Sequence, residues 1–368
     1  MNVRDANPEE LVNWDARTVD TPGGHVLQSR AWAEHERTSG WRPRFLVSDD
    51  EARVLALTRP WPAIGGGSAY VPRGPIPEAD GGELATRLIA VSDFLAADGI
   101  DVLAADPEVP AADAAFGTAI AAARFRPIEE IQPSRHRIRL PLEGRSEDDV
   151  FAAISKSTRQ RIRKAEEVVT AVIRFDATVS ASGAGDGFGS PGDAPSETAE
   201  VALDRFYDLL LETGERRHFS FGPRASFVSW WLTALSAGYL VYLEAWGMRG
   251  DPVAGLILYR HGRRLSTVHS GDHAKDRDET PGALHLLRWR AIQLAIREGC
   301  MEMDLGGVDI EGARREPHEG DELYGLYQHK RSFGGEWLEL TGAHERVSDG
   351  RGYALGRVLQ RAQRVLAR

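Results

Sequence analysis

The sequence predicts a mixed α/β protein built from two units, each a mixed sheet flanked by helices. The chain has 368 residues, which is longer than one hydrophobic core usually serves, so two domains are expected. Its apolar runs also follow a similar order twice: a helix, hairpin strands, a long helix, and a strand that ends in an aspartate. This repeated order indicates a duplicated fold, with the same arrangement of helices and strands in each half.

The first half opens with a predicted helix over residues 27–40, which ends at a glycine. A hairpin is predicted over residues 45–61, because two aspartates separate runs rich in Val, Leu and Phe. Residues 65–80 hold three consecutive glycines and three prolines, a composition typical of a shaped, functional loop. The remaining predicted elements of this half are helices at 83–98 and 114–128 and strands at 100–109 and 138–142.

The second half begins near Arg145 with a strongly helical, basic stretch over residues 147–168. Residues 177–198 are rich in Gly, Ser and Pro, and they predict a flexible excursion because such a segment buries too little apolar surface to fold. The remaining predicted elements are helices at 199–217, 221–238, 281–299 and 354–368, and strands at 171–177, 239–248, 252–262, 265–272 and 301–308.

Charge and composition exclude several classes of protein. The formal net charge is -10 and the sequence pI about 5.6, which argues against a globally basic nucleic-acid-binding protein. No apolar leader or membrane-spanning run is visible, so a cytoplasmic protein is expected. The sequence has no P-loop, HExxH or paired CxxC motif. The single cysteine, Cys300, is expected to be a small buried apolar residue rather than a nucleophile. We therefore expect no metal and no bound cofactor.

Several segments, taken in order, resemble the Fem-type (FemABX) aminoacyltransferases, which build peptidoglycan bridges. The segments are QSRAWAEHERTSGW, YVPRGPI, ADPEV, STRQRIRKAEE, PGALHLLRWRAIQLAIREGCMEMDLGGV and GLYQHKRSFGGEWLELTG. The resemblance spans nearly the whole chain and implies two tandem acetyltransferase-like (GNAT-like) domains. The C-terminal end returns to the first domain, so we expect residues 1–145 plus 344–368 to bind the acceptor and residues 146–343 to carry out the transfer. The chain resembles the members that lack a coiled-coil arm.

The family resemblance also implies the reaction. An amino acid would pass from aminoacyl-tRNA to an amine of a peptidoglycan precursor, which is nucleotide-linked or lipid-linked, and an amide would form. The donor is then a substrate, so no further cofactor is implied. We expect a monomer, and contact with a membrane surface would follow from a lipid-linked acceptor.

Lys330 is the candidate catalytic cation. Attack of an amine on an activated ester passes through a tetrahedral oxyanion, which a positioned cation stabilises. Lys330 with Phe333 matches the lysine and phenylalanine of the family motif, while His329 stands where the family usually has an aromatic residue. A surface lysine beside a strand is the plain alternative.

Asp106 is the candidate that orients the acceptor ammonium or takes its proton, because it ends a strand before a proline. Asp304 precedes two glycines that would let a ligand approach the backbone, and it is expected to line the site. For both aspartates a turn-capping role is an equal alternative. Tyr70 and Arg73, in the loop over residues 65–80, suit an acidic precursor, since a guanidinium binds phosphate and carboxylate in fork geometry. We expect this loop, Asp106 and Lys330 to serve one reaction.

Two further arginines are candidates for the precursor phosphates. Relatives that bind nucleotide-linked precursors carry a lysine on the first helix, where this chain has Glu36 and Arg37. Either Arg37 or Arg30 replaces that lysine, or the acceptor is a different molecule. Arg224, at the start of a later helix, is the second candidate.

A run of basic residues is the expected tRNA contact, because an acidic protein that binds nucleic acid must concentrate its positive charge. Its members are Lys156, Arg159, Arg163 and Lys164. A solvated helix face is the alternative. The C-terminal helix, with Arg357, Arg361, Arg364 and Arg368, is a second basic candidate for tRNA or for an anionic membrane.

Three other functions remain open from the sequence. An acyl-CoA-dependent N-acyltransferase would share the fold, although no glycine-rich pyrophosphate loop opens a helix here. A tRNA-dependent ligase could act on a small peptide metabolite. A binding protein could retain the fold without catalysis.

Overall fold

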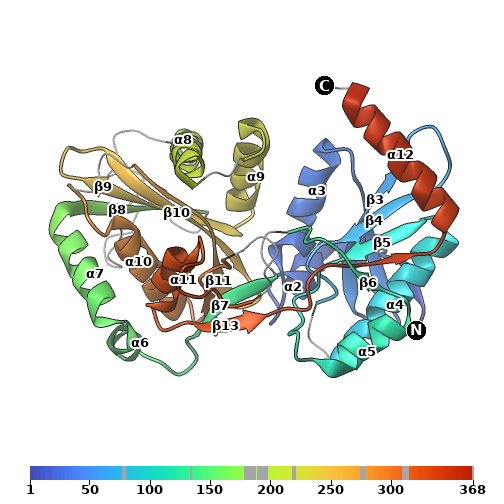
Figure 1. The fold of residues 1–368 in the computed structure, drawn as a ribbon, viewed down its shortest axis with the longest axis horizontal. Helices are drawn as coiled ribbons and strands as arrows, with labels where there is room; N and C mark the ends of the chain where they lie inside the picture. The colour runs from blue at the N-terminus through green and yellow to red at the C-terminus, as the bar shows by residue number, and fades with distance from the viewer. Residues whose placement is uncertain are drawn as a thin grey trace. The chain divides into compact units, whose positions relative to one another are not determined.

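The computed structural model describes residues 1–76, 80–132, 135–177, 188, 198–217, 221–273, 279–308 and 315–366. The chain divides into two compact units, Met1–Arg137 with Leu338–Arg368, and Ile138–Ile310 with Arg315–Trp337. Each unit contains a seven-stranded sheet flanked by helices (Figure 1). The predicted mixed α/β class is therefore confirmed.

The first unit is built around the strand order β1-β2-β3-β4-β5-β14-β6. Its strands are β1 (Val3–Asp5), β2 (Arg42–Ser48), β3 (Arg53–Pro60), β4 (Gly67–Val71), β5 (Val102–Ala105), β6 (Arg126–Pro127) and β14 (His344–Val347). Its helices are α1 (Pro8–Val12), α2 (Trp14–Thr18), the 3-10 helix η1 (Val26–Gln28), α3 (Arg30–Thr38), α4 (Gly81–Ala97), α5 (Ala114–Ala122) and α12 (Gly350–Leu366). The β4–β5 pair is parallel, and α4 makes the crossover between its strands.

Both faces of the first sheet are buried, as β3 shows. Val54 and Ala56 belong to the core formed with α4 and α5, whereas the alternating Leu55 and Leu57 pack with Trp14 of α2 and its neighbours. Successive side chains of a strand point to opposite faces. A continuous apolar run is therefore what a strand covered on both sides requires.

The second unit has the strand order β13-β7-β12-β11-β10-β9-β8. Its strands are β7 (His136–Pro141), β8 (Val169–Asp176), β9 (Leu240–Gly247), β10 (Pro252–His261), β11 (Arg264–Asp272), β12 (Glu302–Asp304) and β13 (Glu336–Glu339). Its helices are α6 (Glu147–Ala153), α7 (Lys156–Val168), α8 (Ala199–Arg217), α9 (Arg224–Ser236), α10 (Ala283–Arg297) and α11 (Tyr324–Arg331). The β11–β12 pair is parallel and is connected through α10.

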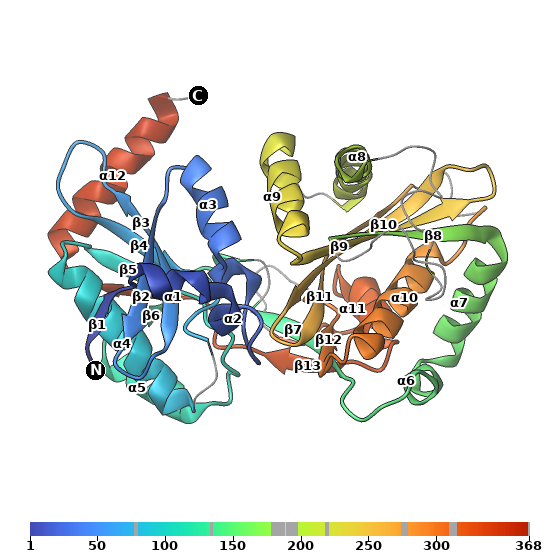
Figure 2. The same cartoon turned by 180° about the vertical axis from the view of Figure 1, so that it is seen from behind.

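Helices cover both faces of the second sheet as well. Figures 1 and 2 show α8 and α9 on one face and α7 with α10 on the other. Leu243 of β9 belongs to the core that includes Leu287 and Ile292 of α10. The opposite face is aromatic: the ring of Tyr242, the neighbour of Leu243, lies 5.1 Å from that of Phe206 on α8.

The two sheets have equivalent topology, and this places the two candidate aspartates. Counted from β6 in the first sheet and from β13 in the second, the parallel pair lies at the third and fourth positions. In each sheet the hairpin strands lie on one side of this pair, and an antiparallel strand that is distant in sequence lies on the other. Asp106 directly follows β5, and Asp304 is the last residue of β12. Both carboxylates therefore lie at the carboxyl end of the second strand of a parallel pair, where ligands bind in open α/β sheets.

Most of the predicted flexible excursion, residues 177–198, lies outside the described residues. Phe188 is described, and it is buried in the core of the second unit, with the guanidinium carbon of Arg174 5.9 Å from its ring centre. Among the described residues, no helix has the length and apolar character that a bilayer crossing requires.

Candidate functional site

The second unit's candidate site forms where the parallel strands β11 and β12 part. Their pairing runs from Arg264 opposite Glu302 to Ser266 opposite Asp304. Strand β12 ends there, whereas β11 continues to Asp272 beside β10. A register shift in the β10–β11 ladder lies directly after Thr267, between the Leu258–Thr267 and Ile257–His269 pairs, and such bulges increase the local twist. After Asp304 the chain leaves β11 but stays beside β7, since the N–H of Leu305 donates to the carbonyl oxygen of Ile138 and the carbonyl oxygen of Gly306 accepts from the N–H of Ile138, and it turns at Gly306.

Lys330 reaches this point from α11. Its side chain is buried, and the Nζ atom donates a hydrogen bond to the carbonyl oxygen of Gly307 at 2.6 Å. Gly306 has a φ of +76° and its N–H donates to Oδ1 of Asp304 at 2.7 Å. A Cβ atom at residue 306 would lie 3.0 Å from Nζ of Lys330. Glycine at this position thus permits both the left-handed turn and the close approach of the lysine.

Burial controls the protonation of this lysine. The pKa of Lys330 is lowered to about 7, first by burial and then by the nearby Arg288 guanidinium, while Asp304 opposes the shift. Burial disfavours the charged form of an amine because the ammonium loses its hydration. At neutral pH the amine is therefore divided between its two forms, and it takes up a proton readily when negative charge develops beside it.

Arg288 is a residue that the sequence reasoning missed. It lies on α10 with only 1% of its surface exposed. Its Nη1 atom lies 3.4 Å from Oγ1 of Thr267, and its Nε atom has no hydrogen-bond partner. Among the described residues no carboxylate contributes to the electrostatics of Arg288, for which burial is the one cause of the pKa shift. The helical spacing of the sequence could have identified Arg288, because it stands on the same apolar face of the helix as Ala291, Ile292 and Ala295.

Burial without a counter-ion disfavours the charged form of Arg288. Its pKa is lowered to about 10, with desolvation as the cause. A buried cation without a partner is costly, since its hydration is lost and no ion pair replaces it. The second unit thus holds two neighbouring buried basic groups, Arg288 and Lys330, against Asp304. Such an arrangement favours entry of negative charge.

His329 and His285 form an imidazole pair next to Lys330. The Nδ1 atom of His329 and the Nε2 atom of His285 are 3.0 Å apart, so one ring donates and the other accepts. Burial is the main cause that lowers the pKa of both rings, to about 4 for His285 and further for His329. Both are therefore neutral near pH 7. Phe333 is fully buried, 6.2 Å from the His285 ring and 5.6 Å from the His329 ring, and supports the pair from the core.

In the first unit, the structure brings Asp106, Tyr70 and Arg73 together. The Tyr70 hydroxyl donates to Oδ1 of Asp106 at 2.9 Å, and the backbone N–H of Arg73 donates to the same atom at 2.8 Å. The Arg73 Nε atom lies 3.7 Å from Oδ2, which has no hydrogen-bond partner. Asp106 is only 2% exposed. Three predicted residues, from two separate segments of the sequence, therefore form one cluster.

The Asp106 carboxyl is poised to exchange a proton near neutral pH. Burial raises its pKa to about 6, and the charge and N–H of Arg73 and the Tyr70 hydroxyl partly offset the effect of burial. A carboxyl group with a pKa close to the working pH is suited to general acid or base chemistry. The geometry also excludes a simple turn cap, since the hydrogen bonds come from the β4 strand and the loop after it.

The two arginines predicted for precursor phosphates lie elsewhere and are engaged. Arg37 is exposed on α3, with its Nε atom 3.0 Å from the Glu34 carboxylate. Arg224 contacts the carboxylates of Asp204, at 3.0 Å, and Asp208 on α8. A guanidinium already paired with carboxylates is less available to a phosphate.

The basic residues predicted to contact tRNA lie on α7. Lys156, Arg163 and Lys164 are exposed, whereas Arg159 is half-buried and donates to the Ala152 carbonyl at 2.7 Å. The buried residues of this helix are Thr158, Ile162 and Ala165. The amphipathic spacing therefore turns most of the basic side chains outward, as the tRNA prediction requires.

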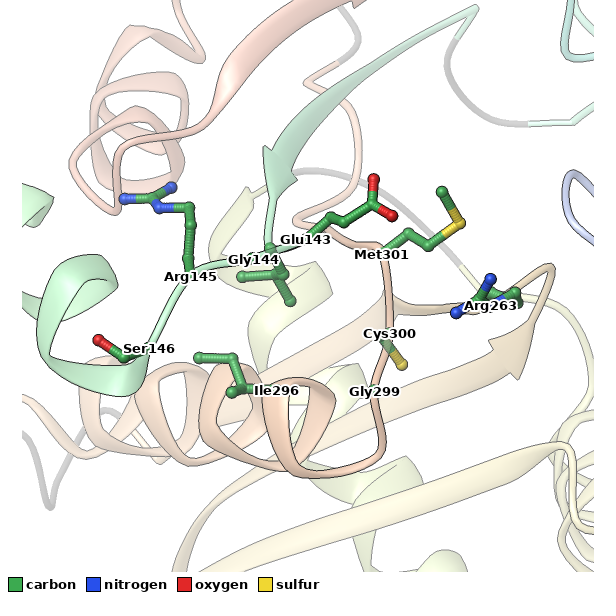
Figure 3. Close-up of a pocket in the computed structure, with 10 residues that line it drawn as sticks. Glu143, Gly144, Arg145, Ser146, Arg263, Ile296, Gly299, Cys300 and Met301 are labelled. Atoms are coloured by element: carbon green, nitrogen blue, oxygen red, sulfur yellow. The ribbon is translucent and has the colours of Figure 1, made fainter.

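A pocket lies at the opposite end of β12 from Asp304 (Figure 3). It is lined by Leu142, Glu143, Gly144, Arg145, Ser146, Arg263, Ile296, Gly299, Cys300 and Met301. None of the predicted site residues is among them. The pKa of the Cys300 thiol is raised to about 12, first by burial, so this cysteine is not a reactive thiolate. In the described part of the chain no cluster of His, Cys, Asp and Glu could hold a metal ion.

A known protein family matches much of the second unit. Residues 153–331 match the family model "Acetyltransferase (GNAT) domain". A search of curated protein sequences gives no significant match. These residues include α7, α10, the strands β8 to β12 and Lys330 on α11.

Solved structures share this fold over most of the chain. The crystal structure of FemX is similar, with a TM-score of 0.74 and 16% sequence identity, over 96% of this chain and 99% of that chain. A conserved protein of unknown function from Bacteroides thetaiotaomicron VPI-5482 has a TM-score of 0.52 and 12% identity, over 93% of this chain and 98% of that chain. The resemblance to the Fem-type enzymes is thus confirmed in the fold: residues 153–331 match an acetyltransferase (GNAT) domain, and the fold of the chain is similar to that of FemX.

Proposed function

We propose that this protein is an aminoacyltransferase that moves an amino acid from aminoacyl-tRNA to an amine of a peptidoglycan precursor stem peptide. The domain match and the fold support an acyltransferase. The observation that carries the proposal is the buried Lys330 amine, hydrogen-bonded at the Gly306–Gly307 turn where β11 and β12 part. A cation held in position beside this turn can stabilise the oxyanion that forms during acyl transfer.

The proposed reaction balances with the groups present. The acceptor amine attacks the ester carbonyl of the donor, a C–N bond forms, and the bond between the carbonyl carbon and the ribose oxygen breaks. The amine loses a proton and the ribose oxygen gains one. The Lys330 ammonium stabilises the oxyanion of the tetrahedral intermediate, and the charge of that intermediate favours the protonated amine.

In this proposal Asp106 serves the acceptor. Its carboxylate orients the acceptor ammonium and accepts a proton from it, and the pKa of about 6 allows the carboxylate form at neutral pH. Arg73 and Tyr70 hold the carboxyl in place through the hydrogen bonds to Oδ1. The basic residues of α7 bind the phosphates of the tRNA donor.

The alternative is an N-acyltransferase that uses acyl-CoA on the same fold. The match of residues 153–331 to an acetyltransferase domain favours it, since that description names acetyl transfer. A tRNA-dependent ligase acting on a small peptide differs only in the acceptor. The pairing of Arg37 with Glu34 keeps this alternative open, because the first-helix cation expected for nucleotide-linked precursors is engaged.

The experiment that separates these functions supplies the purified protein with mixed charged tRNAs, acyl-CoAs and candidate precursors, and follows the mass of the acceptor. Gain of an amino-acid residue on a muropeptide, abolished by prior RNase treatment, is the expected result. Mass gain that survives RNase and depends on acyl-CoA would contradict the proposal. Mass gain on a small peptide but on no muropeptide would show that the proposed acceptor is wrong and that the proposed donor is right.

A further inference from the structure

Helix α12 presents an apolar strip to solvent. Leu355 is 51% exposed and Val358 is 62% exposed, and Ala354 and Ala362 are exposed beside them. These four residues lie on one side of the helix, because positions three, four and seven or eight apart share a face. Large apolar side chains half exposed on adjacent turns of one helix mark an interaction surface rather than scattered surface residues.

The opposite side of α12 explains why this strip cannot turn inward. Gly356 packs against Trp61 so closely that a Cβ atom there would lie 2.2 Å from the indole ring. The Tyr353 hydroxyl lies 3.1 Å from the Glu345 carboxylate. The packed side thus fixes the rotation of the helix, and the strip of Ala354, Leu355, Val358 and Ala362 stays outward. Figures 1 and 2 show α12 beside the sheet of the first unit, with its C-terminal end extending past the strands.

The charge of α12 is opposite to that of the protein. The helix sequence GRGYALGRVLQRAQRVL contains no acidic residue, in a chain with a formal net charge of -10. Arg351, Arg357 and Arg361 are exposed on the same helix as the apolar strip. An amphipathic helix with apolar residues bordered by arginines is the form that lies in the interface of an anionic membrane.

We propose that α12 docks the protein on an anionic lipid surface, with Leu355 and Val358 inserted at the headgroup level and the arginines contacting lipid phosphates. The charge selects a membrane over a second copy of this chain, since a like-charged arginine face would repel itself. This inference concerns where the enzyme works and does not depend on the proposed reaction. Lipid binding requires no turnover, so the two can fail independently.

The test is co-sedimentation of the 368-residue chain with vesicles of phosphatidylglycerol and phosphatidylcholine, or with vesicles of phosphatidylcholine alone. We expect binding to the anionic vesicles that weakens as salt rises. Removal of both apolar side chains in Leu355→Ser with Val358→Ser should reduce the binding by about tenfold or more. Each of Arg351→Gln and Arg361→Gln should weaken it by about fivefold.

Matched controls come from elsewhere on the surface. Val201 on α8 is 52% exposed, so Val201→Ser removes an equally exposed apolar side chain and should leave vesicle binding unchanged. Arg17→Gln and Arg42→Gln, made singly, each remove one exposed positive charge away from α12 and should leave vesicle binding unchanged. Equal binding by the α12 variants and the controls, or no binding by the wild type, would overturn the proposal. So would a concentration-dependent dimer that the Leu355 and Val358 variant loses while no form binds vesicles.

Discussion

The Nζ atom of Lys330 donates a hydrogen bond to the carbonyl oxygen of Gly307 at 2.6 Å. This contact fixes the amine at the point where β12 has ended and β11 continues. It uses one N–H of the ammonium form and leaves the others for an oxyanion. A surface lysine beside a strand would show neither this contact nor the burial, so the plain alternative for Lys330 is excluded.

The rate of transfer should depend on pH as a bell. Activity should rise through pH 6 as Asp106 becomes a carboxylate, because its pKa is raised to about 6. It should fall above pH 7 as Lys330 loses its proton, because that pKa is lowered to about 7. In Lys330→Arg the side chain stays charged throughout this range, so the alkaline fall should disappear. An unchanged alkaline limb in this variant would remove Lys330 from the assignment.

Replacing Arg288 should move the alkaline limb upward. The Arg288 guanidinium contributes to lowering the pKa of Lys330, so Arg288→Met should raise that pKa and extend activity to higher pH. Arg288→Lys retains a cation and is the matched control. Thermal unfolding of Arg288→Met should show little loss of stability, since the variant removes a buried cation without a carboxylate partner. A wild-type pH profile in Arg288→Met would contradict the coupling.

The free energy of unfolding should also depend on pH through Lys330. The pKa of Lys330 is about 7 in the folded protein against an ordinary value of 10.5. Between these values the unfolded chain binds the proton and the folded chain does not, so this group makes stability rise with pH. The slope is on the order of 1 kcal/mol per pH unit. Denaturant unfolding from pH 7 to 9 should show this rise in the wild type relative to Lys330→Met.

Gly306 should tolerate no side chain. Gly306→Ala places a Cβ atom 3.0 Å from Nζ of Lys330 at a φ of +76°, so it should displace the amine and reduce the transfer rate by about 100-fold. Gly299→Ala is the control, because residue 299 has a φ of +69° and nothing within 4 Å of the added atom. The control carries the backbone strain without the contact. Equal activity of the two variants would mean that strain alone is responsible.

Tyr70 should tune Asp106. The Tyr70 hydroxyl donates to the carboxylate and lowers its pKa, so Tyr70→Phe should move the acid limb to higher pH while leaving the maximum rate close to wild type. Asp106→Asn should lose about 100-fold or more in rate, the scale of a general acid or base. An acid limb that stays at pH 6 in Tyr70→Phe would separate Asp106 from that titration.

Much of the fold could be predicted because its signals are local. The apolar periodicity of residues 281–299 and the strand leading to Asp304 are visible in the sequence, and the structure has α10 and β12 there. The pairing of β7 with β12 and of β14 with β5 is not local. Each joins segments more than 150 residues apart, and a short strand carries no mark of its partner.

The candidate site was predictable in part for the same reason. Lys330 and Asp106 stand in segments that resemble a family, so they could be named without a structure. Arg288 stands in an apolar helix face and matches no motif. Its importance depends on burial without a counter-ion, which only the packing of α10 against β11 reveals. The contacts of Arg224 with two carboxylates on α8 could not be predicted either, because they depend on how α8 and α9 pack.

The most direct measurement of the role of Lys330 is single-turnover transfer from purified aminoacyl-tRNA to a muropeptide, comparing wild type, Lys330→Met and Lys330→Arg. We expect RNase-sensitive mass gain in the wild type and a loss of roughly 100-fold to 1000-fold in the rate of Lys330→Met. The affinity for the charged tRNA should stay unchanged, and Lys330→Arg should recover part of the rate. Transfer by Lys330→Met at the wild-type rate would contradict the assignment of Lys330 as the cation that stabilises the oxyanion.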